Sequence, residues 1–183
     1  MTKVFIGGSR KISRLGANVR ARLDRIMARR LFVLVGDANG TDKTVQRYFH
    51  SKGYDRLEVF CSGTGCRNNL GGWSLRTIPA DHPRRDYNFF AIKDRVMAEE
   101  ATVGFMIWDG KSIGTLMNVL RLARHGKKVV VYIAPLREFV DVRSESDVER
   151  IVARCAPELR KRLEHEEKTD QEVDEASKQA HLL

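Results

Sequence analysis

The chain has 183 residues, 33 of them basic and 24 acidic, so its formal net charge is +9. With 42% hydrophobic and 31% charged residues, the composition is typical of a globular domain and excludes a disordered or fibrous chain. The longest hydrophobic runs fall short of the about 20 residues that cross a bilayer, so we expect no membrane partner. We also expect no secretory signal, and the three cysteines lack paired spacing, which indicates a reducing, cytoplasmic location.

The positive charge is unevenly distributed along the chain. Residues 1–135 contain 24 basic and 11 acidic side chains, whereas residues 136–183 contain 9 and 13. A basic body attracts polyanions, which for a protein are nucleic acids or phosphorylated small molecules. Part of this charge has a simpler explanation, because five arginines between residues 20 and 30 fall on one amphipathic helix whose polar face meets solvent.

Hydrophobic strands alternate with amphipathic helices from the N-terminus onward. The expected strands cover residues 3–8, 31–36, 57–61, 102–108 and 129–134, with a short edge strand at 76–80. The expected helices cover residues 15–28, 41–51, 85–100 and 112–125. Residues 62–74 form the longest irregular stretch, and loops of this length are usually functional or mobile.

The pattern changes after Pro135. Residues 147–155 and 158–167 predict two short helices, followed from Lys168 by a polar tail that we expect to fray. We therefore divide the chain into a nucleotide-binding domain, residues 1–135, and an acidic helical extension, residues 136–183. This extension is expected to cover the sheet, mediate a dimer or shield the basic surface.

The alternation predicts an α/β fold, a Rossmann-like open parallel sheet of about five strands in the order 3-2-1-4-5, with helices on both faces. In such sheets ligands bind at the carboxyl ends of the strands, where the strand order reverses. Here that point lies between the first and fourth main strands.

Three glycine-rich turns follow strands at this edge, and each opens a helix. Glycine lets backbone N–H groups approach an anion closely, and the helix N-terminus adds a partial positive charge. The turns supply the expected ligand-binding residues: Gly7, Gly8, Ser9 and Arg10; Gly36, Asp37, Gly40 and Thr41; and Gly110, Lys111, Ser112, Gly114 and Thr115. Among them Ser112, Gly114 and Thr115 are expected to hold a phosphate, with Arg10 and Lys111 adding positive charge. For the second turn, a plain turn with a helix N-cap at Thr41 explains the same residues.

These residues resemble the SLOG superfamily, the Rossmann-like group that includes the LOG phosphoribohydrolases, the DNA-processing protein DprA and the YspA-like proteins. The YspA-like branch is the most similar. Residues 35–42 resemble its Gly-Gly-Ala-x-Gly-Ala-Asp turn, residues 92–97 its Arg-Asn-x-x-Met helix, and residues 109–115 its Gly-Gly-x-Gly-Thr loop. The similarity covers residues 3–134 and implies a pocket for a nucleotide-like ligand, to which Lys93 and Asn118 also belong.

In the hydrolytic LOG members a Glu stands three residues after the Thr of the last loop, and this chain has Asn118 there. Asn cannot act as a carboxylate base or nucleophile, which puts LOG-type hydrolysis in doubt. The candidate catalytic residues are then Asp42, Asp109 and Arg95. For both aspartates a structural role, at a helix start or a turn, is an open alternative.

Other chemistry has weaker support. Cys61 and Cys66 with His50 or His82 lack zinc-ligand spacing, so we expect no metal and no cofactor. Trp73, in the irregular stretch, is interpreted either as a lid that stacks on a base or as a locally packed aromatic residue. Asp86 is interpreted either as a ligand-facing residue or as a helix-start residue.

Three functions follow from these observations. The first is binding of a nucleotide-derived ligand without turnover, as a sensor or carrier. The second is an enzyme that hydrolyses the N-glycosidic bond of nucleoside monophosphates. The third is DprA-like binding of single-stranded nucleic acid, for which the aromatic platform is thin. The resemblance also implies a homo-oligomer.

Overall fold

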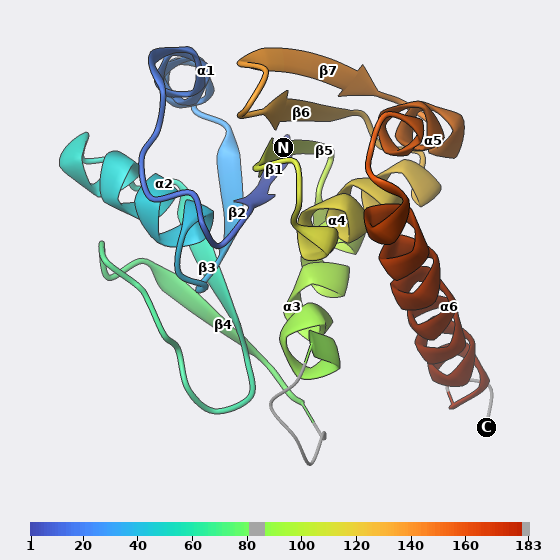
Figure 1. Ribbon diagram of the computed structural model, residues 1–183. Helices are drawn as coiled ribbons and strands as arrows, with labels where there is room; N and C mark the ends of the chain where they lie inside the picture. The colour runs from blue at the N-terminus through green and yellow to red at the C-terminus, as the bar shows by residue number, and fades with distance from the viewer. Residues whose placement is uncertain (81–86, 181–183) are drawn as a thin grey trace.

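The computed structural model describes residues 1–80 and 87–180, with side chains described as far as Val173. Seven strands form one sheet in the order β4-β3-β2-β1-β5-β6-β7 (Figure 1). The strands are β1 (Lys3–Gly8), β2 (Phe32–Gly36), β3 (Leu57–Ser62), β4 (Ser74–Ile78), β5 (Val103–Trp108), β6 (Val129–Ile133) and β7 (Glu138–Val142). All neighbouring pairs are parallel except β6 and β7.

The five central strands confirm the Rossmann-like α/β fold, because β3-β2-β1-β5-β6 is the expected order. The expected edge strand is present as β4. The antiparallel strand β7 was not expected from the sequence. It forms because the chain reverses direction after β6, where Arg137 takes a positive φ of 55°.

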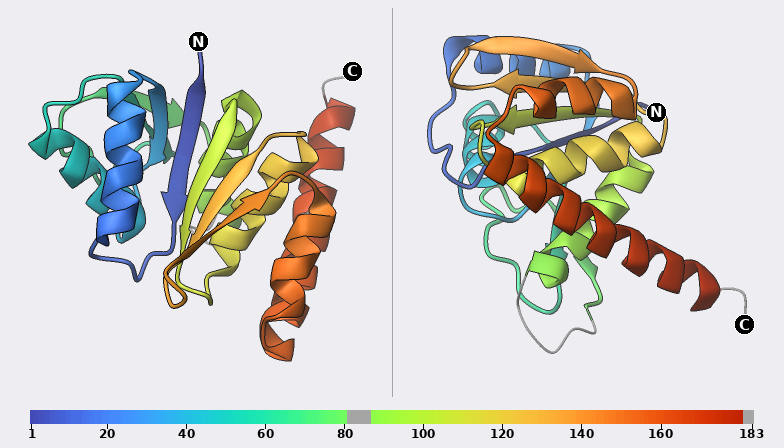
Figure 2. Two further views of the ribbon diagram at one scale, coloured as in Figure 1. Left: turned by 90° about the horizontal axis from the view of Figure 1, so that it is seen from above. Right: turned by 45° about the vertical axis from the view of Figure 1, so that its right-hand side comes forward.

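Helices cover both faces of the sheet (Figure 2). On one face lie α1 (Ala17–Ala28) and α2 (Thr41–Ser51), and on the other α3 (Tyr87–Glu100), α4 (Ile113–Arg124), α5 (Glu145–Ala153) and α6 (Pro157–Ala180). The two hydrophobic cores follow from the strand alternation: Val4 and Ile6 of β1 pack beneath α1 and α2, whereas Phe5 packs beneath the other helices. None of the described helices is both long and apolar enough to cross a membrane.

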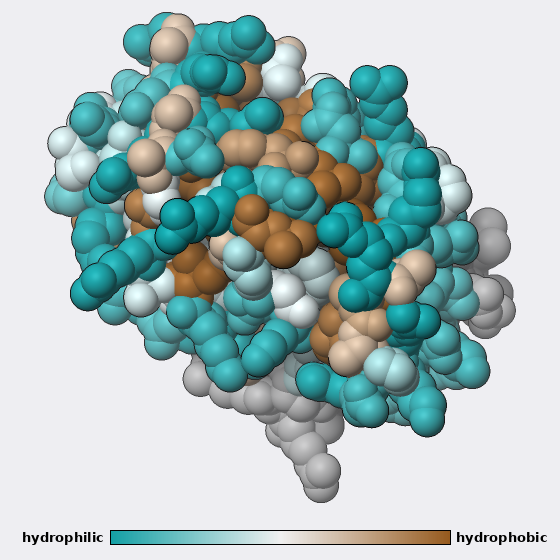
Figure 3. Space-filling model, turned by 45° about the horizontal axis from the view of Figure 1, so that its top comes forward, coloured by the Kyte–Doolittle hydropathy of each residue, from teal (hydrophilic) through white to brown (hydrophobic). Residues whose placement is uncertain are grey.

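The face carrying α1 is only partly covered by helices. Figure 3 shows hydrophobic side chains gathered in the middle of a mostly hydrophilic face when the top of Figure 1 is brought forward. Tyr132 of β6 and Phe139 of β7 pack into the core beneath α1 and α2, and the Arg22 guanidinium lies 4.7 Å from the centre of the Phe139 ring. This cation–π contact ties α1 to the strand that the sequence analysis did not expect.

The extension after Pro135 differs from its expected form. β7 pairs with β6, so a strand stands where only helices were expected. Helix α6 continues through Ala180 rather than fraying from Lys168. The boundary at residue 135 stays a prediction.

A buried ion pair holds α6 against the rest of the molecule. The Asp170 carboxylate is 2% exposed and accepts hydrogen bonds from Arg121 at 2.6 and 2.9 Å and from Arg95 at 2.9 Å. These arginines hold the pKa of Asp170 below its usual value, against the effect of burial. The contact joins three helices, α3, α4 and α6.

Replacement of Asp170 by Asn should destabilise the fold by about 3 kcal/mol, because it leaves two largely buried guanidinium groups without their counter-ion. Urea unfolding followed by circular dichroism measures the change. The exposed Glu172→Gln variant on the same helix is the control and should stay within about 0.5 kcal/mol of the parent. Equal losses in the two variants would contradict this role for Asp170.

Candidate functional site

Ser9, directly after β1, joins the three glycine-rich turns at the carboxyl ends of the strands. Its hydroxyl lies 3.0 Å from Asp109 Oδ1 and 3.2 Å from Thr115 Oγ1, in the turn after β5. Its carbonyl accepts hydrogen bonds from the Thr41 hydroxyl at 3.0 Å and the Thr41 N–H at 3.2 Å, at the start of α2. Ser9 is fully buried, so the expected site residues meet through it rather than through an open crevice.

The Asp109 carboxylate closes the turn between β5 and α4. Its Oδ1 accepts the N–H groups of Lys111 at 3.0 Å and Ser112 at 2.8 Å. The Ser112 hydroxyl then caps α4 by accepting the Thr115 N–H at 3.4 Å. Asp109 is therefore engaged with its own turn. Among the described residues, the N–H groups of Ile113 and Gly114 lack a hydrogen-bond partner.

Close packing within the protein requires glycine at two of the positions that were expected to approach a ligand. A Cβ atom on Gly8 would overlap the carbonyl oxygen of Ile107. Gly40 has a φ of 85°, and a Cβ there would overlap the backbone of Arg10. The remaining expected glycines are also in these turns or at the strand ends that lead into them: Gly7, Gly36, Gly110 and Gly114.

A buried charge cluster lies beneath the end of β2. Lys93 Nζ lies 2.5 Å from Asp94 Oδ1, and Asp42 and Lys93 both approach Gly36 so closely that a side chain there would displace them. Burial raises the pKa of Asp42 to about 7, against the attraction of Lys93. Burial lowers the pKa of Lys93, but Asp94 and Asp42 more than offset that effect and raise it overall.

Asp37 anchors the long loop after β3. Its carboxylate accepts hydrogen bonds from Arg67 Nη2 at 2.6 Å and Nε at 3.1 Å, which hold its pKa below the usual value despite burial. Buried Gln46 adds two contacts, donating to the carbonyl of Gly36 and accepting the N–H of Leu70. Neither Arg67 nor Gln46 was predicted from the sequence, where only the length of residues 62–74 pointed to this loop.

Asn118 links this cluster to the C-terminal helix. Its amide donates to Asp94 Oδ2 at 3.1 Å, and its oxygen accepts from Arg121 at 2.7 Å. Arg121 and Arg95 both contact Asp170 of α6. The network thus brings together Asn118 and Lys93 as expected, whereas the Arg95 guanidinium contacts the C-terminal helix.

The outward-facing side chains at this edge are basic. We define the carboxyl edge as the loops after β1, β2 and β5 together with the first turns of α2 and α4. Five cations lie there. Four are exposed, Arg10, Lys11, Arg14 and Lys111, and one is half-buried, Lys43. Within residues 1–80 and 87–173, none of these five forms an ion pair. Only Arg10 and Lys111 were predicted, although Lys11 and Arg14 are close to Arg10 in sequence.

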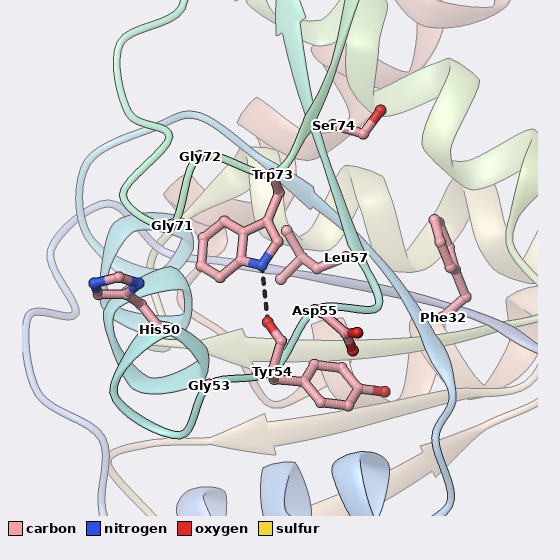
Figure 4. Close-up of a pocket in the computed structure, with 10 residues that line it drawn as sticks. All are labelled: Phe32, His50, Gly53, Tyr54, Asp55, Leu57, Gly71, Gly72, Trp73 and Ser74. Atoms are coloured by element: carbon pink, nitrogen blue, oxygen red, sulfur yellow. Dashed lines mark hydrogen bonds between the residues drawn. The ribbon is translucent and has the colours of Figure 1, made fainter.

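Trp73 lies away from the carboxyl edge. Its indole lines a cavity of about 510 Å³ near the opposite ends of β2, β3 and β4 (Figure 4). Its N–H donates to the carbonyl of Tyr54 at 2.8 Å, so it is a packed wall rather than a lid over the glycine-rich turns. His82 and Asp86 lie outside the described residues.

The raised pKa of Asp42 predicts a pH dependence of stability. Because this pKa is about 7 in the folded protein and 3.8 for an ordinary aspartate, the folded state binds more protons between these values. The free energy of unfolding should therefore fall by about 1.4 kcal/mol between pH 6 and pH 8 from this group alone.

The Asp42→Asn variant keeps an oxygen for the Ala38 N–H and should lose this contribution. Urea unfolding of both proteins at several pH values gives the comparison. The same pH slope in both proteins would contradict the raised pKa.

Comparison with known proteins shows a likeness of fold. No protein-family model matches the chain, and no curated protein matches it either. A solved structure of DNA processing protein A from Helicobacter pylori, described for its single-stranded DNA binding mode, matches with a TM-score of 0.52 and 15% identity. The match covers 71% of this chain but only 64% of that one. The chain therefore shares the Rossmann-like fold of DNA processing protein A.

Proposed function

We propose that the protein binds single-stranded DNA at its carboxyl edge, with the phosphates on the cations of the loops after β1, β2 and β5. The observation that carries this proposal is the separation of charge at that edge. Asp37, Asp42 and Asp109 are all turned toward partners within the protein, whereas Arg10 and Lys111 face solvent.

This separation suits a polyanion better than a single phosphate. Each phosphate that a cation neutralises releases a condensed counter-ion, and such contacts add along a strand. The cations are spread over three loops, and the turn that would hold a single phosphate has two of its N–H groups occupied by Asp109. The structural similarity to a protein that binds single-stranded DNA adds support for this partner.

The Arg10→Ala/Lys111→Ala double variant should bind a single-stranded oligonucleotide more weakly than the parent. Two lost phosphate contacts should also reduce the slope of log affinity against log salt by about 1.4, at about 0.7 per contact for single strands. Fluorescence anisotropy over a series of salt concentrations measures both quantities.

Arg25→Ala/Arg29→Ala is the charge-matched control, because both arginines are exposed near the opposite end of α1. This control should retain the parent's affinity and salt slope. A control as weak as the test variant would show that net charge alone governs binding, against a site at the carboxyl edge.

A second candidate is the binding of a nucleotide phosphate at the start of α4. It is favoured by the N–H groups of Ile113 and Gly114, which have no hydrogen-bond partner among the described residues. A Cβ on Gly114 would lie 3.7 Å from the Tyr87 ring, so the backbone here has room on that side.

No described contact favours N-glycosidic hydrolysis: residue 118 is Asn, and Asp109 is held by its turn. Hydrolysis and a homo-oligomer stay predictions.

If this second site operates, calorimetry with a panel of nucleoside monophosphates should detect binding to the parent, and Gly114→Val should abolish it by filling the approach to the N–H groups. The circular dichroism spectrum and urea midpoint of Gly114→Val check its folding. An unchanged nucleotide affinity in Gly114→Val would reject this site.

A further inference from the structure

The cavity beside Trp73 is separate from the carboxyl edge. Its volume of about 510 Å³ lies within the range of about 300–1,000 Å³ that small-molecule sites occupy. Its lining comes from the start of β2, the end of α2, the segment before and into β3, and the residues that lead into β4. It is therefore built where strands begin, opposite the glycine-rich turns.

The Trp73 indole is held rigidly as one wall of this cavity. Asn69 bonds both the N–H and the carbonyl of Trp73, at 3.1 and 2.9 Å. The indole N–H donates to the Tyr54 carbonyl at 2.8 Å, and a Cβ on Gly71 would collide with the ring. A wall fixed in this way loses little conformational entropy when a planar ligand stacks on it.

The other lining groups suit a planar ring with a polar edge. Figure 4 shows the Trp73 indole next to Leu57, with Asp55 at the edge of the cavity, whereas the Phe32 ring packs into the core on the other face of the sheet. The Trp73 indole provides a surface for stacking, and the exposed Asp55 carboxylate provides a polar edge. The Asp55 carboxylate accepts hydrogen bonds only, so it favours a ring that presents N–H donors.

We propose that this cavity binds an unpaired nucleobase, with guanine preferred. Guanine presents two adjacent N–H donors on one edge, which a carboxylate accepts as a pair, whereas adenine presents a donor beside an acceptor. None of the lining residues is Lys or Arg, so recognition is of the base rather than of a phosphate. Asp55 is the residue that determines specificity.

The chain contains its own reporter for this binding. It has two tryptophans, and Trp108 is only 3% exposed within β5, where its indole donates to the Ser112 carbonyl. Titration with guanosine up to about 1 mM should therefore quench the emission of Trp73 in a saturable way. The Trp108→Phe variant should show the same quenching, because the signal comes from Trp73.

Specificity is tested with two variants and two ligands. Asp55→Asn should weaken guanosine binding at least about tenfold, as expected for a lost paired hydrogen bond, and adenosine should bind the parent more weakly than guanosine. Trp73→Leu, measured by calorimetry, should weaken the binding of both nucleosides, because it removes the stacking surface. The exposed Glu149→Gln variant is the control and should bind guanosine like the parent.

Two further results keep this proposal distinct from DNA binding at the carboxyl edge. Guanosine carries no phosphate, so Arg10→Ala/Lys111→Ala should bind it with the parent's affinity. Loss of guanosine binding in that double variant would overturn the proposal by placing the ligand at the carboxyl edge. The absence of saturable quenching in the parent, or equal guanosine affinity in Asp55→Asn and the parent, would overturn it as well.

Discussion

The internal pairing of the acidic side chains at the carboxyl ends of the strands is the constraint on which the rest of the structure depends. Asp109 is satisfied by its own turn, Asp37 by Arg67, and Asp42 lies buried beside Lys93. Buried carboxylates without partners would carry a large desolvation cost, so these contacts shape the loops around them. The cations of the carboxyl edge then face solvent, and this edge of the sheet is basic.

The fold was largely predictable from the sequence, because its signals are local. Continuous hydrophobic runs marked the central strands, and the crossover helices followed from helical spacing. The failures lie after Pro135. β7 is a short edge strand whose partner supplies its hydrogen bonds, and the second half of α6 is held by the contact of Asp170 with Arg121. Both elements depend on contacts with residues that are far away in the sequence. The spacing of hydrophobic residues along the chain does not reveal such contacts.

The meeting of the glycine-rich turns was predictable, but the contacts that their side chains make were not. The glycine-rich turns do meet at one edge, as the rule for parallel sheets predicts. Which groups remain available there depends on which hydrogen bonds the protein forms with itself. Asp109 illustrates this, since a turn-forming residue and a ligand-binding residue look the same in sequence. Trp73 does too: its loop was singled out, but its contact with Tyr54 places it at the other end of the sheet.

Hydrogen–deuterium exchange with and without a single-stranded oligonucleotide tests the central claim most directly, because it reports where the strand contacts the protein. The account predicts slower exchange on binding in residues 9–14, 40–44 and 109–114, which make up the carboxyl edge. Protection confined to β7 and α6, with those three segments unchanged, would contradict it.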